Sequence, residues 1–224
     1  MTLEERGAIT RALPTRERRV ASVMLFDEFL PVYDVSDEVA TVVSADQMTT
    51  WQALMNADLI AVGRQRPLVA LLGAVRMLPD LVWQRLHGEH GEMPERLTLR
   101  DTTKLPMAGG GWVLLGERPP DEIALGLVGK FWRPVIEFAD VEASAFRDWA
   151  EPGFAKTIYA LGTRRVDDDA TLLWAMMRTA TTDEHARDWF RRYWTFGVGS
   201  GAHVLARGLI DVVRDEVEQR TRPQ

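Results

Sequence analysis

The chain has 224 residues, of which 46% are hydrophobic and 27% are charged, a balance typical of a globular protein with a sizeable core. Its formal net charge of −6 argues against a general nucleic-acid binder, because affinity for phosphates depends on clustered Lys and Arg. The absence of cysteine excludes disulfides, thiolate metal sites and a cysteine nucleophile.

The first 30 residues are rich in charge and carry one predicted helix, roughly from Pro14 to Leu30, which ends before Pro31. We interpret residues 1–30 as a helical lead-in and residues 31–220 as a single domain. No apolar run near the N-terminus has the form of a secretory signal, and no apolar stretch reaches the ~18 to 20 residues that a membrane span needs. We therefore expect a cytoplasmic protein without a membrane span.

The next segment combines a strand with helices. A β-branched run bounded by turn formers predicts a strand from Val35 to Ala45. Asp46 then has the character of a helix N-cap, and the residues that follow place Trp51 on one apolar helix face. A second helical region is predicted over residues 66–88.

From Leu97 onward, short apolar runs are separated by turn signals, which is typical of antiparallel strands. A short helix interrupts them at residues 141–153, and a long helix follows a capping residue at Thr182 or Asp183. The predicted strands occupy residues 97–102, 109–119, 121–138, 155–166 and 170–182. A sheet of this size needs a cover for its apolar face, so the order of elements predicts an α+β fold with two layers.

The long helix contains the sequence GVGSGA at residues 197–202. Each of its three glycines costs roughly 0.5 to 1 kcal/mol relative to alanine inside a helix. We therefore predict either a kink at this point or a close approach of the sheet or a ligand to the helix backbone.

Alternation along the last predicted strand places Trp174, Met176 and Arg178 on one side of the sheet. If that side is buried, the guanidinium of Arg178 needs a partner, which is either a protein carboxylate or an acidic group of a ligand. If that side faces solvent, Arg178 carries no information about function. The sequence leaves both interpretations open.

Several stretches occur here in the order and spacing of a bacterial branch of the START-like, or SRPBCC, superfamily. They are FLPVYDV, LVGKFWRP, EPGFAKTIYALGTRRV, RTATTD and FRRYWTFGVGSGAHVLARGLIDVV, and together they span roughly residues 30–220. The chain resembles this superfamily, which includes polyketide cyclase/dehydrase and lipid-transport-like proteins. The resemblance implies a helix-grip fold, in which a curved antiparallel sheet wraps around a long C-terminal helix.

The resemblance also implies a hydrophobic small molecule held between the sheet and that helix. Some members of the superfamily cyclise or dehydrate such a molecule, and many only bind and carry it. Where this branch often has a carboxylate that pairs with the arginine of the last strand, the present chain has Met176 beside Arg178. A histidine often found before the first strand is also missing. Both departures make the expected interior less polar and favour binding over acid/base chemistry.

Few residues carry other chemistry. His87 and His90 lie three apart in a glycine-containing segment, too few ligands to predict a metal site. His203 on the long helix is the histidine best placed to act as an acid or base, although a solvent-facing or hydrogen-bonded helix histidine is the simpler interpretation. Glu137 and Tyr159 are further polar groups on predicted strands.

We therefore expect binding of a hydrophobic, lipid- or polyketide-like molecule in a cavity between the sheet and the C-terminal helix, with no cofactor. Arg178 and His203 would orient a polar end of the ligand. An enzyme of the cyclase or dehydratase type, with His203 as base, and a packed domain that acts through protein contacts remain as alternatives. The oligomeric state is left open. The predicted ligand-binding residues are Trp51, Phe131, Trp132, Trp174, Met176, Arg178, Tyr193, Trp194, Ser200 and His203.

Overall fold

The computed structural model describes residues 23–61, 95–104 and 111–221. The predicted helical region 66–88, with His87 and His90, lies outside the described residues, as does most of the predicted helix in the lead-in. The helices are α2 (Leu25–Phe29), α3 (Gln47–Asn56), α6 (Ala143–Phe146), α7 (Glu184–Tyr193) and α8 (Gly199–Thr221), with a 3-10 turn η2 (Asp101–Lys104) and a π-helical turn η3 (Trp194–Val198). The strands are β1 (Val35–Val43), β2 (Val113–Arg118), β3 (Glu122–Lys130), β4 (Glu137–Phe138), β5 (Ala155–Arg165) and β6 (Thr171–Thr181).

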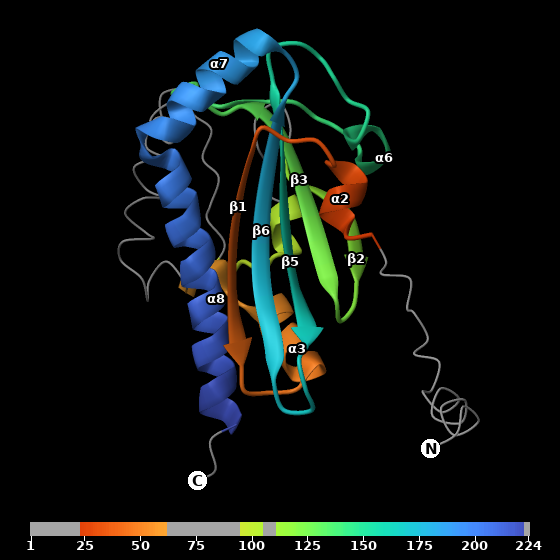
Figure 1. Ribbon diagram of the computed structural model, residues 1–224, viewed down its shortest axis with the longest axis vertical. Coiled ribbons are helices and arrows are strands. Elements are labelled where there is room, and N and C mark those ends of the chain that lie inside the picture. The colour runs from red at the N-terminus through yellow and green to blue at the C-terminus, as the bar shows by residue number, and fades with distance from the viewer. Residues whose placement is uncertain (1–22, 62–94, 105–110, 222–224) are drawn as a thin grey trace, which may run out of the picture.

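The six strands form one antiparallel sheet in the order β1-β6-β5-β3-β2, and the short β4 pairs with β3. Figure 1 shows α8 running along the β1 edge of this sheet, with α7 lying across the end of the strands. The chain therefore has the α+β helix-grip architecture that the element order and the family resemblance predicted: an antiparallel sheet with a long C-terminal helix on one side.

Different helices cover the two faces of the sheet. Because side chains alternate along a strand, Leu173 and Ala175 of β6 pack in the apolar cluster that contains α3 and α8. Trp174 and Met176 pack instead toward the cluster that contains α2 and α6. We call the first side the helix face and the second the outer face.

The predicted N-cap of α3, Asp46, is confirmed. The Asp46 carboxylate accepts hydrogen bonds from the backbone nitrogen and the hydroxyl of Thr49, at 2.9 and 2.6 Å. These bonds lower the pKa of Asp46. The cap fixes the start of α3, whose Trp51 and Leu54 are buried against the helix face.

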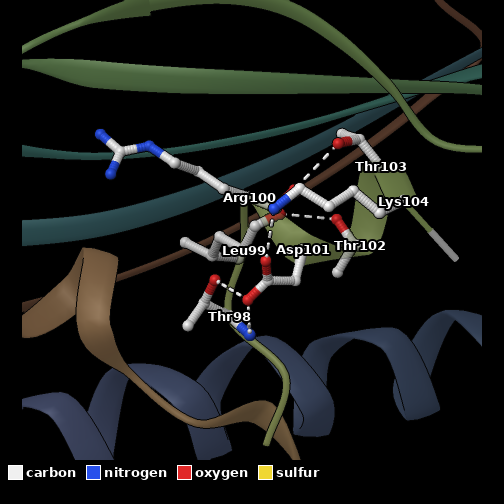
Figure 2. A network of polar contacts seen from close by, with 7 residues as sticks. All are labelled: Thr98, Leu99, Arg100, Asp101, Thr102, Thr103 and Lys104. Atoms are coloured by element: carbon white, nitrogen blue, oxygen red, sulfur yellow. Dashed lines mark hydrogen bonds and ion pairs between the residues drawn. The ribbon is translucent and has the colours of Figure 1, made fainter. Parts of the chain in front are cut away.

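The predicted strand at residues 97–102 is wrong, because this segment turns into η2 (Figure 2). The Asp101 carboxylate accepts hydrogen bonds from the backbone nitrogen and hydroxyl of Thr98, at 3.2 and 2.6 Å, and from the Lys104 ammonium at 2.9 Å. The Thr98 hydroxyl makes the largest contribution to a lowered pKa of about 2 for Asp101. Short polar side chains thus satisfy the local backbone in place of a neighbouring strand.

The predicted kink in the long helix is confirmed. The helix breaks at η3, a π-helical turn, into α7 and α8, whose axes differ by 63°. A Cβ atom on Gly199 would lie 2.6 Å from the Trp194 ring, so glycine allows the indole to lie against the backbone here. Among the described residues, no single helix is long and apolar enough to cross a membrane, and only this bent pair passes that test together.

Candidate functional site

Trp174, Met176 and Arg178 do lie on one side of β6, as alternation predicted, but this side is the outer face. They are therefore separated by the sheet from α8. Their expected position, between the sheet and the C-terminal helix, is wrong. The alternation of burial along β6 is clear, yet a sequence does not state which face of a two-sided sheet a helix will cover.

Arg178 has a protein carboxylate as its partner. Its Nη1 lies 2.7 Å from Oδ1 of Asp27 in α2, and its guanidinium carbon lies 4.4 Å from the ring centroids of both Phe26 and Tyr33. The arginine side chain is only 11% exposed. These contacts attach α2 to the outer face. Of the two partners that the sequence left open for Arg178, a protein carboxylate or an acidic group of a ligand, the structure shows the protein carboxylate.

Four of the predicted residues do come together. Phe131, Trp132, Tyr193 and Trp194 belong to one apolar cluster at the α7 end of the sheet, where Phe190 and Trp194 stack with ring centroids 5.9 Å apart. Phe131 is buried and the other three predicted residues are half-buried. We call this group the aromatic cluster.

The remaining predicted residues are more scattered. Trp51 is buried in the core between α3 and the helix face. Ser200 is exposed in the first turn of α8. The structure therefore does not collect the ten predicted residues into one pocket.

A row of side chains across the helix face stands out from the core around it. In the strand register Tyr159 of β5 pairs with Met177 of β6, and Met177 pairs with Asp37 of β1. The next row toward the core, Leu161, Ala175 and Val39, is entirely apolar and packs in the cluster with α8. A phenol and a carboxylate therefore occur where the packed core ends.

Tyr159 lies deep in the protein but is not fully covered. Burial raises the pKa of its phenol well above the ordinary value, and the nearby Tyr193 and Asp37 raise it further. Its side chain nevertheless remains half-buried, and no hydrogen bond joins its hydroxyl to the described residues. Part of this deep side chain therefore stays accessible.

Trp112, which precedes β2, is the aromatic neighbour of Tyr159. Its ring meets that of Tyr159 edge-on, with centroids 5.3 Å apart at 71°. It is half-buried and packs against both the core cluster and the aromatic cluster. Tyr159 and Trp112 thus lie at the junction of two apolar clusters, between the packed core and the α7 end.

His203 of α8 reaches the same row from the helix. Its Nδ1 lies 2.9 Å from Oδ1 of Asp37, which ties α8 to β1 and sets the plane of the imidazole. The histidine side chain is half exposed, and no hydrogen bond joins its Nε2 to the described residues. The expectation that His203 faces the sheet–helix space stays a prediction, but its hydrogen-bonded partner is now identified as Asp37.

Sequence reasoning identified Tyr159 as a polar strand residue but did not identify Trp112, Asp37 or Met177. Whether a position is odd or even within its strand indicates which face of the sheet its side chain occupies. Combining that parity across strands requires the register, which depends on long-range pairing and is not readable from a single strand. The described residues hold no group of three His or acidic side chains that would ligate a metal.

No known family profile matches the chain, and no curated protein matches it. Three solved structures are similar at low levels. A conserved protein from Geobacillus kaustophilus is 11% identical, with a TM-score of 0.37 and coverage of 83% of this chain and 96% of that one. A hypothetical protein from Helicobacter pylori is 10% identical, with a TM-score of 0.39 and coverage of 84% and 94%.

The third structure, the Zhui aromatase/cyclase from Streptomyces sp. R1128, is 10% identical, with a TM-score of 0.31 and coverage of 84% of this chain and 96% of that one. None of these similarities is high enough to indicate what the present chain binds. The fold rests on the strand order and packing described above, and function has to be argued from the site itself.

Proposed function

We propose that the protein binds an apolar small molecule with one polar group, on the helix face between the packed core and the aromatic cluster. The ligand's apolar body would contact Trp112, Met177 and the aromatic cluster. Its polar group would exchange a hydrogen bond with the Tyr159 hydroxyl. The proposal thus assigns the hydrophobic ligand that the family resemblance implies to a specific position on the sheet.

The observation that carries the proposal is the state of Tyr159. Its hydroxyl makes no hydrogen bond to the described residues, and part of its side chain stays uncovered, so the hydroxyl is available to a ligand. A ligand group that hydrogen-bonds this hydroxyl while its apolar body covers the ring is recognised by both contacts. An apolar pocket with a few placed polar groups is also the usual design of a small-molecule site.

The first test is mass spectrometry of an organic extract of the purified protein, which is expected to contain a stoichiometric apolar compound. The second uses naphthol, an apolar ring with one hydroxyl, as a defined probe. Its binding is followed through the ¹³C-labelled methyl group of Met177, next to Tyr159 in the register. We expect naphthol to shift this signal and Tyr159→Phe to weaken binding about tenfold, the equivalent of 1.4 kcal/mol.

An empty extract together with an unchanged Met177 signal would instead favour the packed domain that acts through protein contacts. The matched control is Tyr33→Phe, which changes a tyrosine on the outer side beside Arg178 and leaves the helix face intact. Tyr33→Phe is expected to bind naphthol as the wild type does.

The Asp37–His203 pair favours a second candidate function, acid/base catalysis on the bound molecule. A carboxylate that accepts from Nδ1 holds the imidazole so that Nε2 is left for a substrate. Incubation of the extracted compound with the protein would then yield a product lighter by one water. His203→Gln should abolish that product and leave naphthol binding unchanged, whereas a pure binding protein forms no product in either form.

A further inference from the structure

The outer face carries a hollow of about 970 Å³ that lies across the sheet from Tyr159. This volume falls near the upper end of the ~300 to 1,000 Å³ typical of small-molecule sites. We infer that this hollow is a second binding site, for a flat apolar molecule that carries one anionic group. The inference does not depend on the proposed function of the helix face.

The floor of the hollow is an aromatic platform. The Trp174 indole lies against Gly162 of the neighbouring strand, where an added Cβ would lie 2.5 Å from the ring. Phe26 of α2 supports the indole edge-on, with ring centroids 5.9 Å apart at 82°. The indole remains half-buried, and Leu172 and Met176 flank it on the same face. A ring held in this way offers an uncovered surface to a flat apolar group.

At one end of the hollow lies a positive charge, that of Arg164, without a partner among the described residues. Arg164 pairs in register with Leu172, is exposed, and makes no ion pair or hydrogen bond with the described residues. The other lining arginines are engaged, since Arg118 bonds Glu28 and Glu122 while Arg165 pairs with Asp168. A free guanidinium binds a carboxylate, phosphate or sulfonate group through two parallel hydrogen bonds.

The opposite end of the hollow has the opposite charge. Glu38 is exposed, pairs in register with Met176 and also makes no ion pair with the described residues. Leu172 and Met176 are four residues apart on β6, which separates the two ends by about 13 Å at the usual rise of a strand. An anionic group is therefore attracted to the Arg164 end and repelled from the Glu38 end, which fixes the orientation of the ligand across Trp174.

Two further carboxylates line the hollow, those of Asp121 and Glu122. Asp121 accepts a hydrogen bond from the Gln47 side chain at 2.9 Å. Glu122 is buried and accepts from the Leu25 backbone nitrogen and from Arg118. Glu122 is thus paired with a cation, whereas Asp121 has only a neutral donor and keeps its negative charge, so Arg164 binds the anionic group in competition with this one carboxylate.

Anilinonaphthalene sulfonate, which combines fused rings with one sulfonate, is a suitable probe. Its site is read from ¹³C-labelled methionine methyl groups, because the consecutive residues Met176 and Met177 lie on opposite faces of the sheet. We expect the probe to shift the Met176 signal, with Met176→Leu and Met177→Leu providing the assignments. Arg164→Glu should weaken this binding at least tenfold, and the uncharged analogue phenylnaphthylamine should be insensitive to the change.

Arg191→Glu is the matched control, since it makes the same charge change at an exposed arginine of α7, away from the hollow. It should leave the Met176 titration unchanged. The proposal for the outer face would be overturned if Arg164→Glu bound the probe as tightly as the wild type does. It would also be overturned if the probe shifted the methyl signal of Met177 and not that of Met176. The naphthol result on the helix face is independent of either outcome.

Discussion

Arg178 of β6 and Asp27 of α2 are joined by a 2.7 Å ion pair that connects residues 151 positions apart in the chain. The guanidinium carbon also lies 4.4 Å from the centroids of two aromatic rings, and its Nε has no hydrogen-bond partner among the described residues. This mostly buried arginine therefore helps to hold the five-residue helix α2 on the outer face, together with the Arg118–Glu28 ion pair and the buried side chains of Leu25 and Phe26.

Asp27→Asn should reduce the free energy of unfolding by about 1 to 2 kcal/mol, because a mostly buried guanidinium loses its charged partner. This expected loss is smaller than that for a fully buried ion pair, because the Asp27 side chain is 44% exposed. Urea denaturation provides the measurement. Glu28→Gln is the control, with an expected loss below about 1 kcal/mol, since Arg118 retains Glu122. Equal losses in both variants would contradict the special role of Arg178.

Glu122 gives a prediction about acidic pH. Burial raises its pKa, against the hydrogen bonds from Leu25 and Arg118, so the folded state binds this proton more readily than the unfolded state. The stabilising contribution is complete below the unfolded pKa of about 4.3 and declines as the pH rises through the folded value. The stability of the wild type relative to Glu122→Gln should therefore fall between about pH 4 and pH 7. Urea midpoints measured across this range that run parallel would refute the assignment.

Gly199 and Gly201 of α8 should respond in opposite ways to substitution by alanine. At Gly201 an added Cβ meets nothing within 4 Å, so Gly201→Ala should stabilise the protein by about 0.5 to 1 kcal/mol through helix propensity. At Gly199 the Cβ would displace the Trp194 ring, so Gly199→Ala should lower the melting temperature. Thermal unfolding monitored by circular dichroism distinguishes the two. A similar response of both variants would show that Trp194 does not need this glycine.

Tyr159 predicts a loss of stability at alkaline pH. Its raised pKa means that the unfolded chain releases the phenol proton first, from about pH 10 upward. The stability that the neutral phenol contributes is thus present below that pH and declines above it. Between about pH 9 and pH 11, the free energy of unfolding should therefore decline less for Tyr159→Phe than for Tyr33→Phe. Identical alkaline profiles would indicate that Tyr159 is fully hydrated.

Local patterns predicted much of the fold because they follow from short-range chemistry. The Asp46 cap, the kink at the glycines and the alternation along β6 each involve neighbours in sequence. The failures involve partners far along the chain. Residues 97–102 resemble a strand by composition, but Asp101 bonds Thr98 and forms a turn.

The candidate site was harder to predict for the same reason. Trp174 and Trp51 have the apolar character of pocket residues, yet one lies on the outer face and the other in the core. Asp37 becomes informative only through His203, 166 positions away. Residue type identified candidates, whereas the strand register and the choice of covered face decided which of them meet.

The solid packing of Leu161, Ala175 and Val39 beneath α8 limits the depth available on the helix face. A long flexible tail would have to force these side chains apart, whereas a compact fused-ring compound could stop above them. In the proposed site, this packed layer should therefore limit the length of the ligand, favouring short, broad molecules over extended acyl chains.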